Sequence, residues 1–406
     1  MGGGGDEVFN NFDGTKVTKL KVKIEEPGYY CLGFIDGDIS WDKPTHIDWG
    51  YGNARTTLTT PITNYAQANN STNWYINYSE PGEYVISIDG WYNHFQCNDS
   101  STEKSGVTQI SEVLIEVIQV SSFITKFDFT FENCSKLTSM PPRLFDKNIS
   151  VTSFNGTFAR CSSLTNIPFG LFDNGISVKG FKETFYDCSS LASIPSGLFD
   201  DSTSVENFDR TFYNCYNLTN IPAGLFDGNK NVKSFSQTFA RCSSLTNIPA
   251  GLFGNNTSIK VFDRTFEGCS NLTEIPAGLF AGNTSVENFG ATFYGCSNLT
   301  EIPAGLFDEN INMLYLNDTF ADCKNLKSIP SGLFNNNKGV ISFYETFMNC
   351  FSLTGETPYT KLSDGARIKL WDRDEANGFV KPTETSRVFY GCTNLDDYEL
   401  IPDAWK

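Results

Sequence analysis

The sequence predicts a mainly β protein in which an N-terminal β-sandwich precedes a solenoid of short strands and helical turns. Nine cysteines between Cys134 and Cys350 recur at one constant spacing, that between Cys134 and Cys161. A fixed period of about 20 to 50 residues is the signature of a repeat protein. Ahead of these cysteines, alternating apolar and polar residues are separated by clusters of glycine, proline and asparagine, which is typical of strands joined by turns. At 406 residues, the chain exceeds one ordinary hydrophobic core, so a domain plus a solenoid is expected.

These changes of pattern divide the chain into four parts. Residues 1–5 are a flexible glycine tail, residues 6–122 the sandwich, residues 123–353 a solenoid of about nine repeats, and residues 354–406 a capping repeat with an insertion. The alternation of apolar and polar residues predicts sandwich strands at Val17–Ile24, Tyr29–Ile35, His46–Trp49, Trp74–Tyr78, Tyr84–Ile88 and Val113–Val120.

The last part departs from the period and then returns to it. Glu356 stands where the frame requires isoleucine, and an insertion that contains Trp371 and Asp372 follows. The frame resumes at Val388 and Phe389. A solenoid needs an atypical last repeat to cover the exposed end of its core, so we interpret this segment as a cap.

Each repeat carries the frame T-F-x-x-C-x-x-L-x-x-I-P-x-G-L-F-D, followed by V-x-x-F. We expect V-x-x-F and L-x-x-I-P to form two short strands per turn, with tight helical turns between them. The proline ends its strand because it has no N–H for the ladder, and the glycine two residues later permits a tight turn. The threonine is expected to cap the following turn through its hydroxyl. An aspartate expected to fix a turn recurs as Asp173, Asp200, Asp227 and Asp308.

The cysteines of the repeats are interpreted as small buried apolar side chains, a common role of free cysteine. They occupy one equivalent site in successive turns: Cys134, Cys161, Cys188, Cys215, Cys242, Cys269, Cys296, Cys323 and Cys350. Metal binding needs clustered ligands such as C-x-x-C, and the sequence has no such cluster and two histidines, His46 and His94. We therefore expect no metal and no cofactor. Cys31 and Cys97 both lie in the N-terminal region, where a single disulfide can form.

The charge balance excludes some partners. The chain has 30 Lys and Arg against 47 Asp and Glu, a net charge of −17, which argues against binding to nucleic acid or to an anionic membrane surface. No stretch approaches 18 apolar residues, so no membrane span is expected. The start, Met1-Gly2-Gly3-Gly4-Gly5-Asp6, lacks the charged and apolar regions of a secretory signal peptide, and we expect the glycine run to act as a flexible tether.

Catalysis is not predicted. The sequence has no G-x-S-x-G, no H-E-x-x-H and no phosphate-binding loop, and His94 is close in sequence to Cys97 alone. Glycoside hydrolysis would need two carboxylates about 5 to 10 Å apart in a cleft, which adjacent turns of a solenoid can supply. We attribute the many Asn-x-Ser/Thr triplets, such as Asn148-Ile149-Ser150 and Asn217-Leu218-Thr219, to the asparagine-rich composition.

The positions that vary while the frame holds are the candidates for ligand contact. Two lie between T-F and the cysteine, and two precede each threonine. The pairs before threonine include Asp263-Arg264, Gly290-Ala291 and Asn317-Asp318. Exposed tyrosine and arginine often anchor binding interfaces, and ordinary solvated surface is the alternative. The candidate binding residues are Tyr186, Tyr213, Tyr294, Arg160 and Arg241.

Two segments of the N-terminal region resemble motifs of PKD-type immunoglobulin-like domains. Ile47-Asp48-Trp49-Gly50-Tyr51-Gly52 resembles the W-G-D-G turn of that family, and residues 78–88, YSEPGEYVISI, resemble its Y-x-x-P-G-x-Y-x-V strand. Tyr51 stands where the family usually has aspartate, which argues against a calcium or polar role of the turn. The resemblance implies an extracellular spacer or binding module, which is rarely a catalyst.

The C-x-x-L-x-x-I-P and T-F-x-x-C frames resemble the BspA-type leucine-rich repeats of bacterial surface proteins, in a long variant that has the period of the cysteines. The resemblance extends over the whole predicted solenoid, residues 123–353, and it implies a leucine-rich-repeat fold. It also implies adhesion to host matrix proteins, other microbes or glycans. Similar repeats occur in proteins of gut Bacteroides and their phages.

Together these features predict a non-enzymatic protein, extracellular or on a cell surface, that presents a rigid repeat surface to a protein or glycan on a cell or mucus surface. One alternative is a structural or receptor-binding component of a bacteriophage virion, in contact with other virion proteins. A second alternative is a carbohydrate-active enzyme. Neither nucleic-acid binding nor direct insertion into a membrane is expected.

Overall fold

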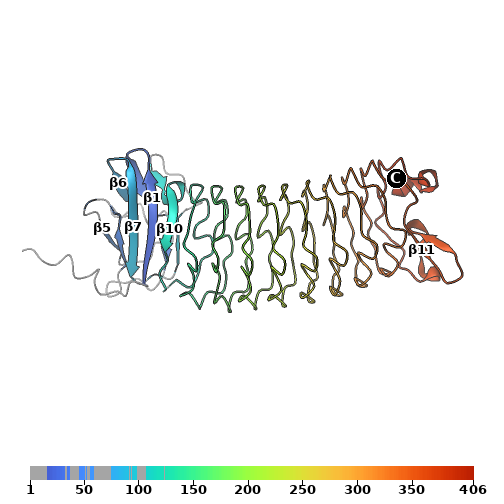
Figure 1. The fold of residues 1–406 in the computed structure, drawn as a ribbon, viewed down its shortest axis with the longest axis horizontal. Coiled ribbons are helices and arrows are strands. Elements are labelled where there is room, and N and C mark those ends of the chain that lie inside the picture. Colours follow the sequence, from blue (N-terminus) through green and yellow to red (C-terminus); the bar gives the residue numbers. More distant parts are fainter. Residues whose placement is uncertain are drawn as a thin grey trace, which may run out of the picture. The chain divides into compact units, whose positions relative to one another are not determined.

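The computed structural model describes residues 16–32, 34–36, 45–50, 52, 55–58, 75–90, 92, 94–97, 107–122 and 124–406. The chain forms two compact units, Met1–Leu191 and Ala192–Lys406, and each is described by itself (Figure 1). The predicted glycine tail, residues 1–5, lies outside the described residues. Within the described part of the chain, no helix is long and apolar enough to span a membrane.

The first unit begins with short strands that form three sheets (Figure 1). The sheets have the strand orders β10-β1-β7-β4-β5, β6-β2-β9 and β3-β8. Only β2 and β9 pair in parallel among these strands. The strands and the short 3-10 helix η2 are β1 (Val17–Ile24), β2 (Gly28–Cys31), β3 (Phe34–Asp36), β4 (Thr45–Asp48), β5 (Arg55–Leu58), β6 (Tyr75–Tyr78), β7 (Gly82–Gly90), β8 (His94–Gln96), β9 (Val107–Gln109), η2 (Ile110–Glu112) and β10 (Leu114–Gln119).

Alternation along β1 explains its place in the largest sheet. Leu20, Val22 and Ile24 are buried, whereas Lys19 and Lys23 are exposed, because successive side chains of a strand point to opposite faces. The predicted strand Tyr29–Ile35 is wrong as one element. β2 ends at Cys31 and pairs with β6 and β9, and β3 then pairs with β8, so the chain changes sheets within that stretch. The sandwich arrangement of these sheets stays a prediction.

The two segments that resemble PKD-type motifs meet in the first unit. The Tyr78 hydroxyl donates a hydrogen bond of 2.7 Å to the carbonyl oxygen of Trp49, which is buried. Gly50 has a φ of 71°, and a Cβ there would lie 2.4 Å from the carbonyl oxygen of Val85. Only glycine therefore fits this turn. Tyr51 lies outside the described residues, and membership of the PKD family stays a prediction.

The first coils of the repeat continue directly from the strands of the same unit. The amide of Thr138 donates to the carbonyl of Ile115 in β10 at 3.0 Å, and Glu116 forms a parallel bridge with Ser139. The rings of Phe95 and Phe131 pack edge to face with centroids 5.6 Å apart. The strands and the coils of the first unit thus share one core, and the predicted boundary at residue 122 lies inside that unit.

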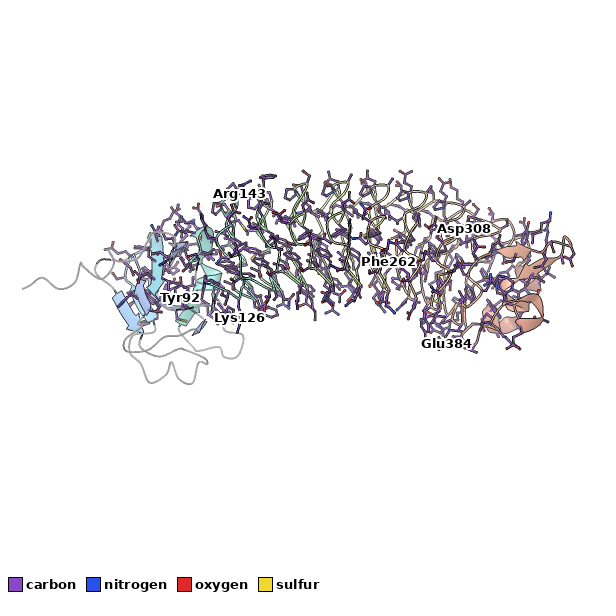
Figure 2. The ribbon with its side chains drawn as sticks, turned by 90° about the horizontal axis from the view of Figure 1, so that it is seen from below. Tyr92, Lys126, Arg143, Phe262, Asp308 and Glu384 are labelled. Carbon is purple, nitrogen blue, oxygen red and sulfur yellow. The ribbon has the colours of Figure 1, made fainter. Side chains whose placement is uncertain are left out.

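The second unit stacks one coil per repeat around a core of apolar side chains, with Phe262 inside the stack and Asp308 and Glu384 at its surface (Figure 2). Equivalent phenylalanines stack from coil to coil. The centroids of Phe239 and Phe266 are 5.7 Å apart with ring planes 6° from parallel. In one coil the frame residues at most 5% exposed are Val232, Phe235, Thr238, Phe239, Cys242, Leu245, Ile248, Leu252, Phe253 and Asn256.

The two predicted strands per turn are wrong. Residues 124–353, all of which the structure describes, contain isolated parallel bridges and no strand of several residues. In the second unit, the bridges join the V-x-x-F segments. The L-x-x-I-P segments are joined by the amide that follows leucine, at distances from 2.9 Å at Thr354 to 3.5 Å at Thr246, and proline removes the next donor.

The recurring threonine acts as a donor and not as the predicted cap. The Thr265 hydroxyl donates to the carbonyl of Phe262 at 2.8 Å and to that of Phe235, in the preceding coil, at 3.0 Å. The cysteine thiol completes a second coil-to-coil contact, because Cys269 Sγ lies 3.2 Å from the carbonyl oxygen of Phe239. Both side chains therefore link neighbouring coils in addition to filling the core.

All twelve cysteines are free and buried, so the disulfide considered for Cys31 and Cys97 is absent. Burial raises the pKa of the Cys269 thiol, which suppresses the reactive thiolate. We expect a thiol reagent to modify almost none of them in the folded protein and all twelve after denaturation. Mass spectrometry of the alkylated protein with and without a reductant checks this, and mass gained only after reduction would contradict it.

A buried asparagine ladder is a feature that the sequence interpretation missed. The Asn283 side-chain amide donates to the carbonyl of Phe253 at 3.0 Å and to that of Asn256 at 3.1 Å. In the second unit, the same two bonds recur at Asn229, Asn256, Asn310 and Asn337. Each rung satisfies two backbone carbonyls that water cannot reach.

Residues 354–406 complete the last coil with substitute groups. The guanidinium of Arg373 donates to the carbonyls of Asn337 and Phe334, the acceptors that the next asparagine of the ladder would use. Phe389 stacks on Phe347, and the amide of Phe389 donates to the carbonyl of Trp405 at 2.9 Å. The regular elements here are β11 (Tyr359–Lys361), β12 (Arg367–Lys369), η3 (Leu370–Asp372), η4 (Glu375–Asn377), η5 (Tyr398–Leu400) and η6 (Asp403–Trp405).

Candidate binding surface

The V-x-x-F segments of the second unit present one continuous face, which we call the bridge face. Valine and phenylalanine point into the core. Most residues between them and in the pair before each threonine are half-buried or exposed, whereas Ala291, Ser342 and Glu345 are buried. One residue of each segment forms a parallel bridge to the next coil: Asn207, Ser234, Val261, Asn288, Tyr315 and Ser342. The bridge face consists of these residues and the pairs before threonine in the same coils.

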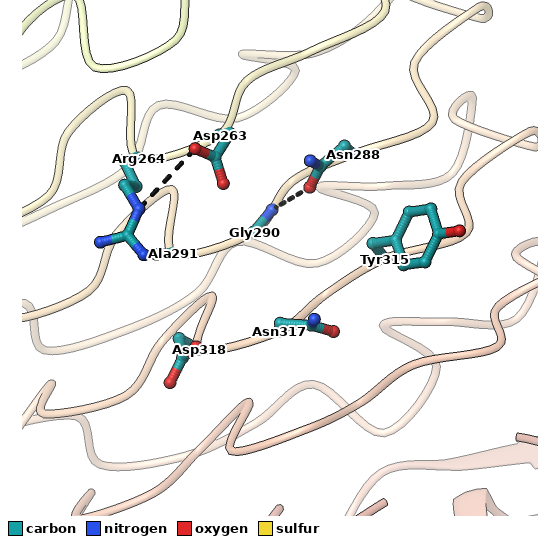
Figure 3. Close-up of a pocket in the computed structure, with 8 residues that line it drawn as sticks. All are labelled: Asp263, Arg264, Asn288, Gly290, Ala291, Tyr315, Asn317 and Asp318. Atoms are coloured by element: carbon teal, nitrogen blue, oxygen red, sulfur yellow. Dashed lines mark hydrogen bonds and ion pairs between the residues drawn. The ribbon is translucent and has the colours of Figure 1, made fainter. Parts of the chain in front are cut away.

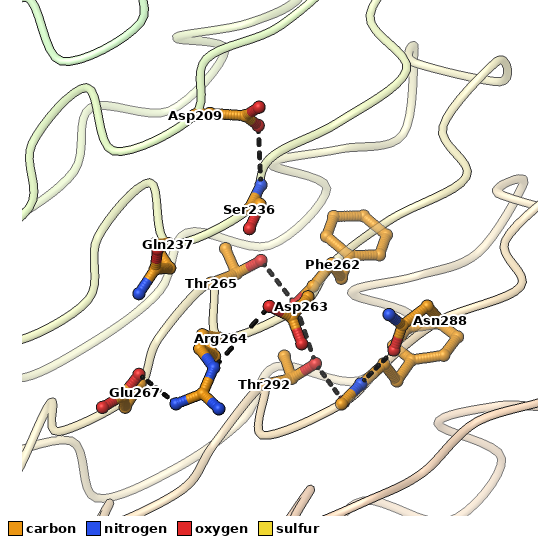
Figure 4. Close-up of polar contacts among 12 residues, drawn as sticks. Asp209, Ser236, Gln237, Phe262, Asp263, Arg264, Thr265, Glu267, Asn288 and Thr292 are labelled. Carbon is orange, nitrogen blue, oxygen red and sulfur yellow. Dashed lines mark hydrogen bonds and ion pairs between the residues drawn. The ribbon is translucent and has the colours of Figure 1, made fainter.

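Polar side chains connect neighbouring coils across the bridge face (Figure 4). Asp209 accepts from the Ser234 hydroxyl at 2.5 Å and from the Ser236 amide at 3.1 Å. Arg210 Nε donates to Gln237 Oε1 at 2.6 Å. These contacts fix the side chains of the face before any ligand arrives, which lowers the entropic cost of binding.

Besides the glycine before leucine and phenylalanine in most coils, such as Gly251, two variable positions in every coil have a left-handed backbone. The residue before each threonine has positive φ, for example 55° at Arg264, 50° at Ala291 and 57° at Asp318, and so does the residue before each cysteine. Any residue without a branched Cβ tolerates this conformation better than Val, Ile or Thr. The backbone therefore restricts these variable positions while leaving their polarity free to change.

The bridge face contains a hollow of about 300 Å³ at the coil that carries Gly290 and Ala291 (Figure 3). Neighbouring coils have Asp263-Arg264 and Asn317-Asp318 at the equivalent positions. The space is left because Gly290 has no side chain and Ala291 has only a methyl group. The lining residues are Asp263, Arg264, Asn288, Gly290, Ala291, Tyr315, Asn317 and Asp318.

Charges of both signs surround this hollow. Arg264 lies 3.7 Å from Asp263 Oδ2 and 3.3 Å from Glu267 Oε2. Burial raises the pKa of Asp263 against the opposing effect of Arg264. Burial and the neighbouring carboxyl of Glu345 raise the pKa of Asp318 to about 6. Among the described residues, no group of three or more His, Cys, Asp or Glu is placed to hold a metal ion.

The raised pKa of Asp318 predicts a dependence of stability on pH. The folded protein keeps this proton up to about pH 6, whereas an unfolded aspartate releases it near pH 3.9. Because the folded state binds more protons between these values, its stability falls as pH rises through that window. We expect Asp318→Asn to raise the melting temperature relative to wild type at pH 7.5 but not at pH 3.5.

Circular dichroism melts at both pH values measure this difference. Glu301→Gln, which neutralises an exposed carboxylate in the same unit, is the matched control for the change in net charge. If the melting temperature of Asp318→Asn exceeds that of this control by the same amount at both pH values, the raised pKa of Asp318 is contradicted.

The predicted binding residues lie at the turn before each cysteine, not at the hollow. Arg160 stacks over the half-buried Tyr186 at 5.5 Å, and in the second unit Arg241 stacks over Tyr213 at 5.4 Å. Tyr294 hydrogen-bonds to Asp322, and burial raises its pKa. The structure thus pairs these residues with neighbouring coils, which leaves the tyrosines less exposed than predicted.

Six of the eight lining residues were within the variable pairs before threonine, so the sequence carried part of the signal. The candidate binding residues were chosen among tyrosines and arginines. Gly290 was therefore not among them, although its lack of a side chain opens the hollow. Tyr315 and Asn288 were missed because their V-x-x-F positions were assigned to strands.

The repeat region matches a known protein family. Residues 155–278 and 208–354 match the family profile of the BspA type leucine rich repeat region, with six copies. No curated protein is significantly similar to this chain.

The solved structures that match part of this chain have low sequence identity to it. The Toll–Spätzle complex of Drosophila is 17% identical with a TM-score of 0.31, and the match covers 55% of this chain and 36% of that one. Its glycosylated form is 16% identical with a TM-score of 0.25, covering 61% and 40%. The TLR13–ssRNA13 complex is 13% identical with a TM-score of 0.23, covering 60% and 43%. In each case the match spans less than half the length of the solved chain.

Proposed function

Because residues 155–354 match the BspA-type leucine-rich repeat region, we propose that this protein is a non-enzymatic binding protein, exposed outside the cell or on its surface. It attaches to a protein or glycan on a cell or mucus surface through the bridge face of the second unit. The N-terminal strands act as a PKD-like spacer or attachment module. The net charge of −17 favours neutral or basic partners over anionic ones.

The observation that supports this function is the combination of order and chemical variety on the bridge face. The backbone of that face is bonded from coil to coil, as in the 2.9 Å bond from the Phe262 amide to the Asn288 carbonyl. Upon this backbone the coils present amide, carboxylate, guanidinium and phenol groups. Function in repeat proteins uses such extended, rigid surfaces.

Binding of the labelled protein to gut bacterial cells, mucin and matrix proteins tests the proposal. We expect selective binding to at least one of these surfaces. Val261→Arg, which places a long side chain on the bridge face, should abolish binding. Thr257→Arg adds the same charge at an exposed position outside that face and should leave binding intact. Absence of binding to every surface overturns the binding function, and equal effects of the two variants overturn the role of the bridge face.

Carbohydrate hydrolysis is the second candidate, because Asp263 and Asp318 both line the hollow. Paired carboxylates in different environments can divide the roles of acid and base. Incubation with mucin glycans and measurement of released reducing sugar separates hydrolysis from binding. Release that disappears in Asp318→Asn would replace the binding function by catalysis.

A further inference from the structure

The hollow at Gly290 interrupts an otherwise filled row of side chains. A Cβ on Gly290 would lie 3.0 Å from both Asp263 Oδ1 and Asn288 Oδ1. Two acceptor oxygens from adjacent coils therefore converge on one empty position. The Gly290 amide already donates to Asn288 Oδ1 at 2.7 Å, which holds that side chain in place and leaves it further capacity to accept.

The remaining lining groups surround this position with donors and one aromatic ring (Figure 3). Arg264 and the amides of Asn288 and Asn317 supply N–H donors. Tyr315 is 37% exposed and forms part of the wall. The volume of about 300 Å³ falls at the lower end of small-ligand sites, which measure roughly 300–1,000 Å³.

We propose that this hollow binds one neutral sugar ring of a surface glycan, an inference that rests on the proposed binding function and assigns its ligand. Sugar hydroxyls both donate and accept hydrogen bonds, so they match a wall of mixed carboxylate, amide and guanidinium groups. The C–H face of a pyranose packs on an aromatic ring, here Tyr315. The lining contains two carboxyl groups, Asp263 and Asp318, and one guanidinium, Arg264. This excess of acidic groups disfavours binding of a negatively charged sugar.

An extended peptide fits this face less well. Addition of a peptide strand needs free backbone donors and acceptors at an edge. On the bridge face, the Phe289 amide already donates to the Tyr315 carbonyl at 3.0 Å, and the Leu314 amide donates to the Glu287 carbonyl at 2.9 Å. A ligand must therefore contact the side chains of this face. At the hollow most of these side chains are polar and can hydrogen-bond to hydroxyl groups.

Gly290→Asn fills the hollow with a residue that the repeat accepts. The equivalent position carries Asn155 in one coil and Asn317 in another, and Gly290 does not have positive φ, so the variant should fold. Gly254→Asn makes the same substitution at an exposed glycine outside the bridge face and is the matched control. Gly254 also lacks positive φ, and the equivalent position in a later coil carries Asn335. Melting curves of both variants verify folding.

Saturation-transfer NMR with methyl glycosides of galactose, mannose, fucose and N-acetylglucosamine, and with sialic acid, tests the ligand. We expect at least one neutral glycoside to bind the wild type and Gly254→Asn, with at least tenfold weaker binding to Gly290→Asn. Equal binding to Gly290→Asn, preference for sialic acid, or no binding of any glycoside overturns the sugar site. If the wild type still binds cells, mucin or matrix in those cases, the proposed function stands without it.

Discussion

Asn283→Leu is expected to lower the free energy of unfolding by about 1–4 kcal/mol. Leucine has a similar volume but donates no hydrogen bond, so the carbonyls of Phe253 and Asn256 lose their side-chain donors. The Asn256 carbonyl is then left without a donor in a fully buried position, which costs about 1–3 kcal/mol, whereas the Phe253 carbonyl keeps the 3.1 Å bond from the Asn256 amide. Urea denaturation followed by circular dichroism measures the loss, and hydrogen exchange locates it in the coils next to residue 283.

Asn312→Leu is the matched control, because Asn312 also donates to a carbonyl of the preceding coil, that of Thr284 at 2.9 Å. Asn312 is exposed, so water can replace the lost donor and the change should cost no more than about 0.5 kcal/mol. Equal losses in the two variants would show that the buried ladder contributes no more than surface contacts do.

The periodicity of the chain predicted the core but not this ladder. Cys242, Leu245 and Phe253 stand out from the sequence because apolar residues at fixed spacing indicate burial. Asparagine is common throughout the chain, so its triplets were attributed to composition. The signal was its return once in every repeat from Asn229 to Asn337, a regularity that surface asparagines have no physical reason to keep.

The candidate site was less predictable for a different reason. The pairs before threonine change from coil to coil, and we interpreted this variation as freedom for ligand contact. The structure adds a constraint, since the second residue of each pair has positive φ, and none of them is Val, Ile or Thr. The hollow depends on a missing side chain at Gly290, whose effect appears only when Asp263 and Asn317 flank it in space.

Arg373→Met is expected to lower the free energy of unfolding by about 2–4 kcal/mol. Arg373 is 2% exposed and donates to the carbonyls of Phe334 at 2.7 Å and Asn337 at 3.1 Å. Methionine keeps much of the volume but leaves the Asn337 carbonyl without a donor, which costs about 1–3 kcal/mol. The Phe334 carbonyl keeps only its 3.3 Å bond from the Asn337 amide. It also removes the stacking of the guanidinium on Phe379 at 4.3 Å.

The cost of desolvating the buried Arg373 guanidinium opposes the gain from its two hydrogen bonds, and the stability of Arg373→Met shows which of the two is larger. Burial lowers the pKa of the Arg373 guanidinium to about 10, so the group remains charged at neutral pH and its desolvation destabilises the folded state. Arg373→Gln removes the charge but keeps amide donors like those of the asparagine ladder. We expect the order of stability wild type, Arg373→Gln, Arg373→Met in urea denaturation. If Arg373→Met is at least as stable as wild type, desolvation outweighs the two hydrogen bonds, and Arg373 does not stabilise the end of the ladder.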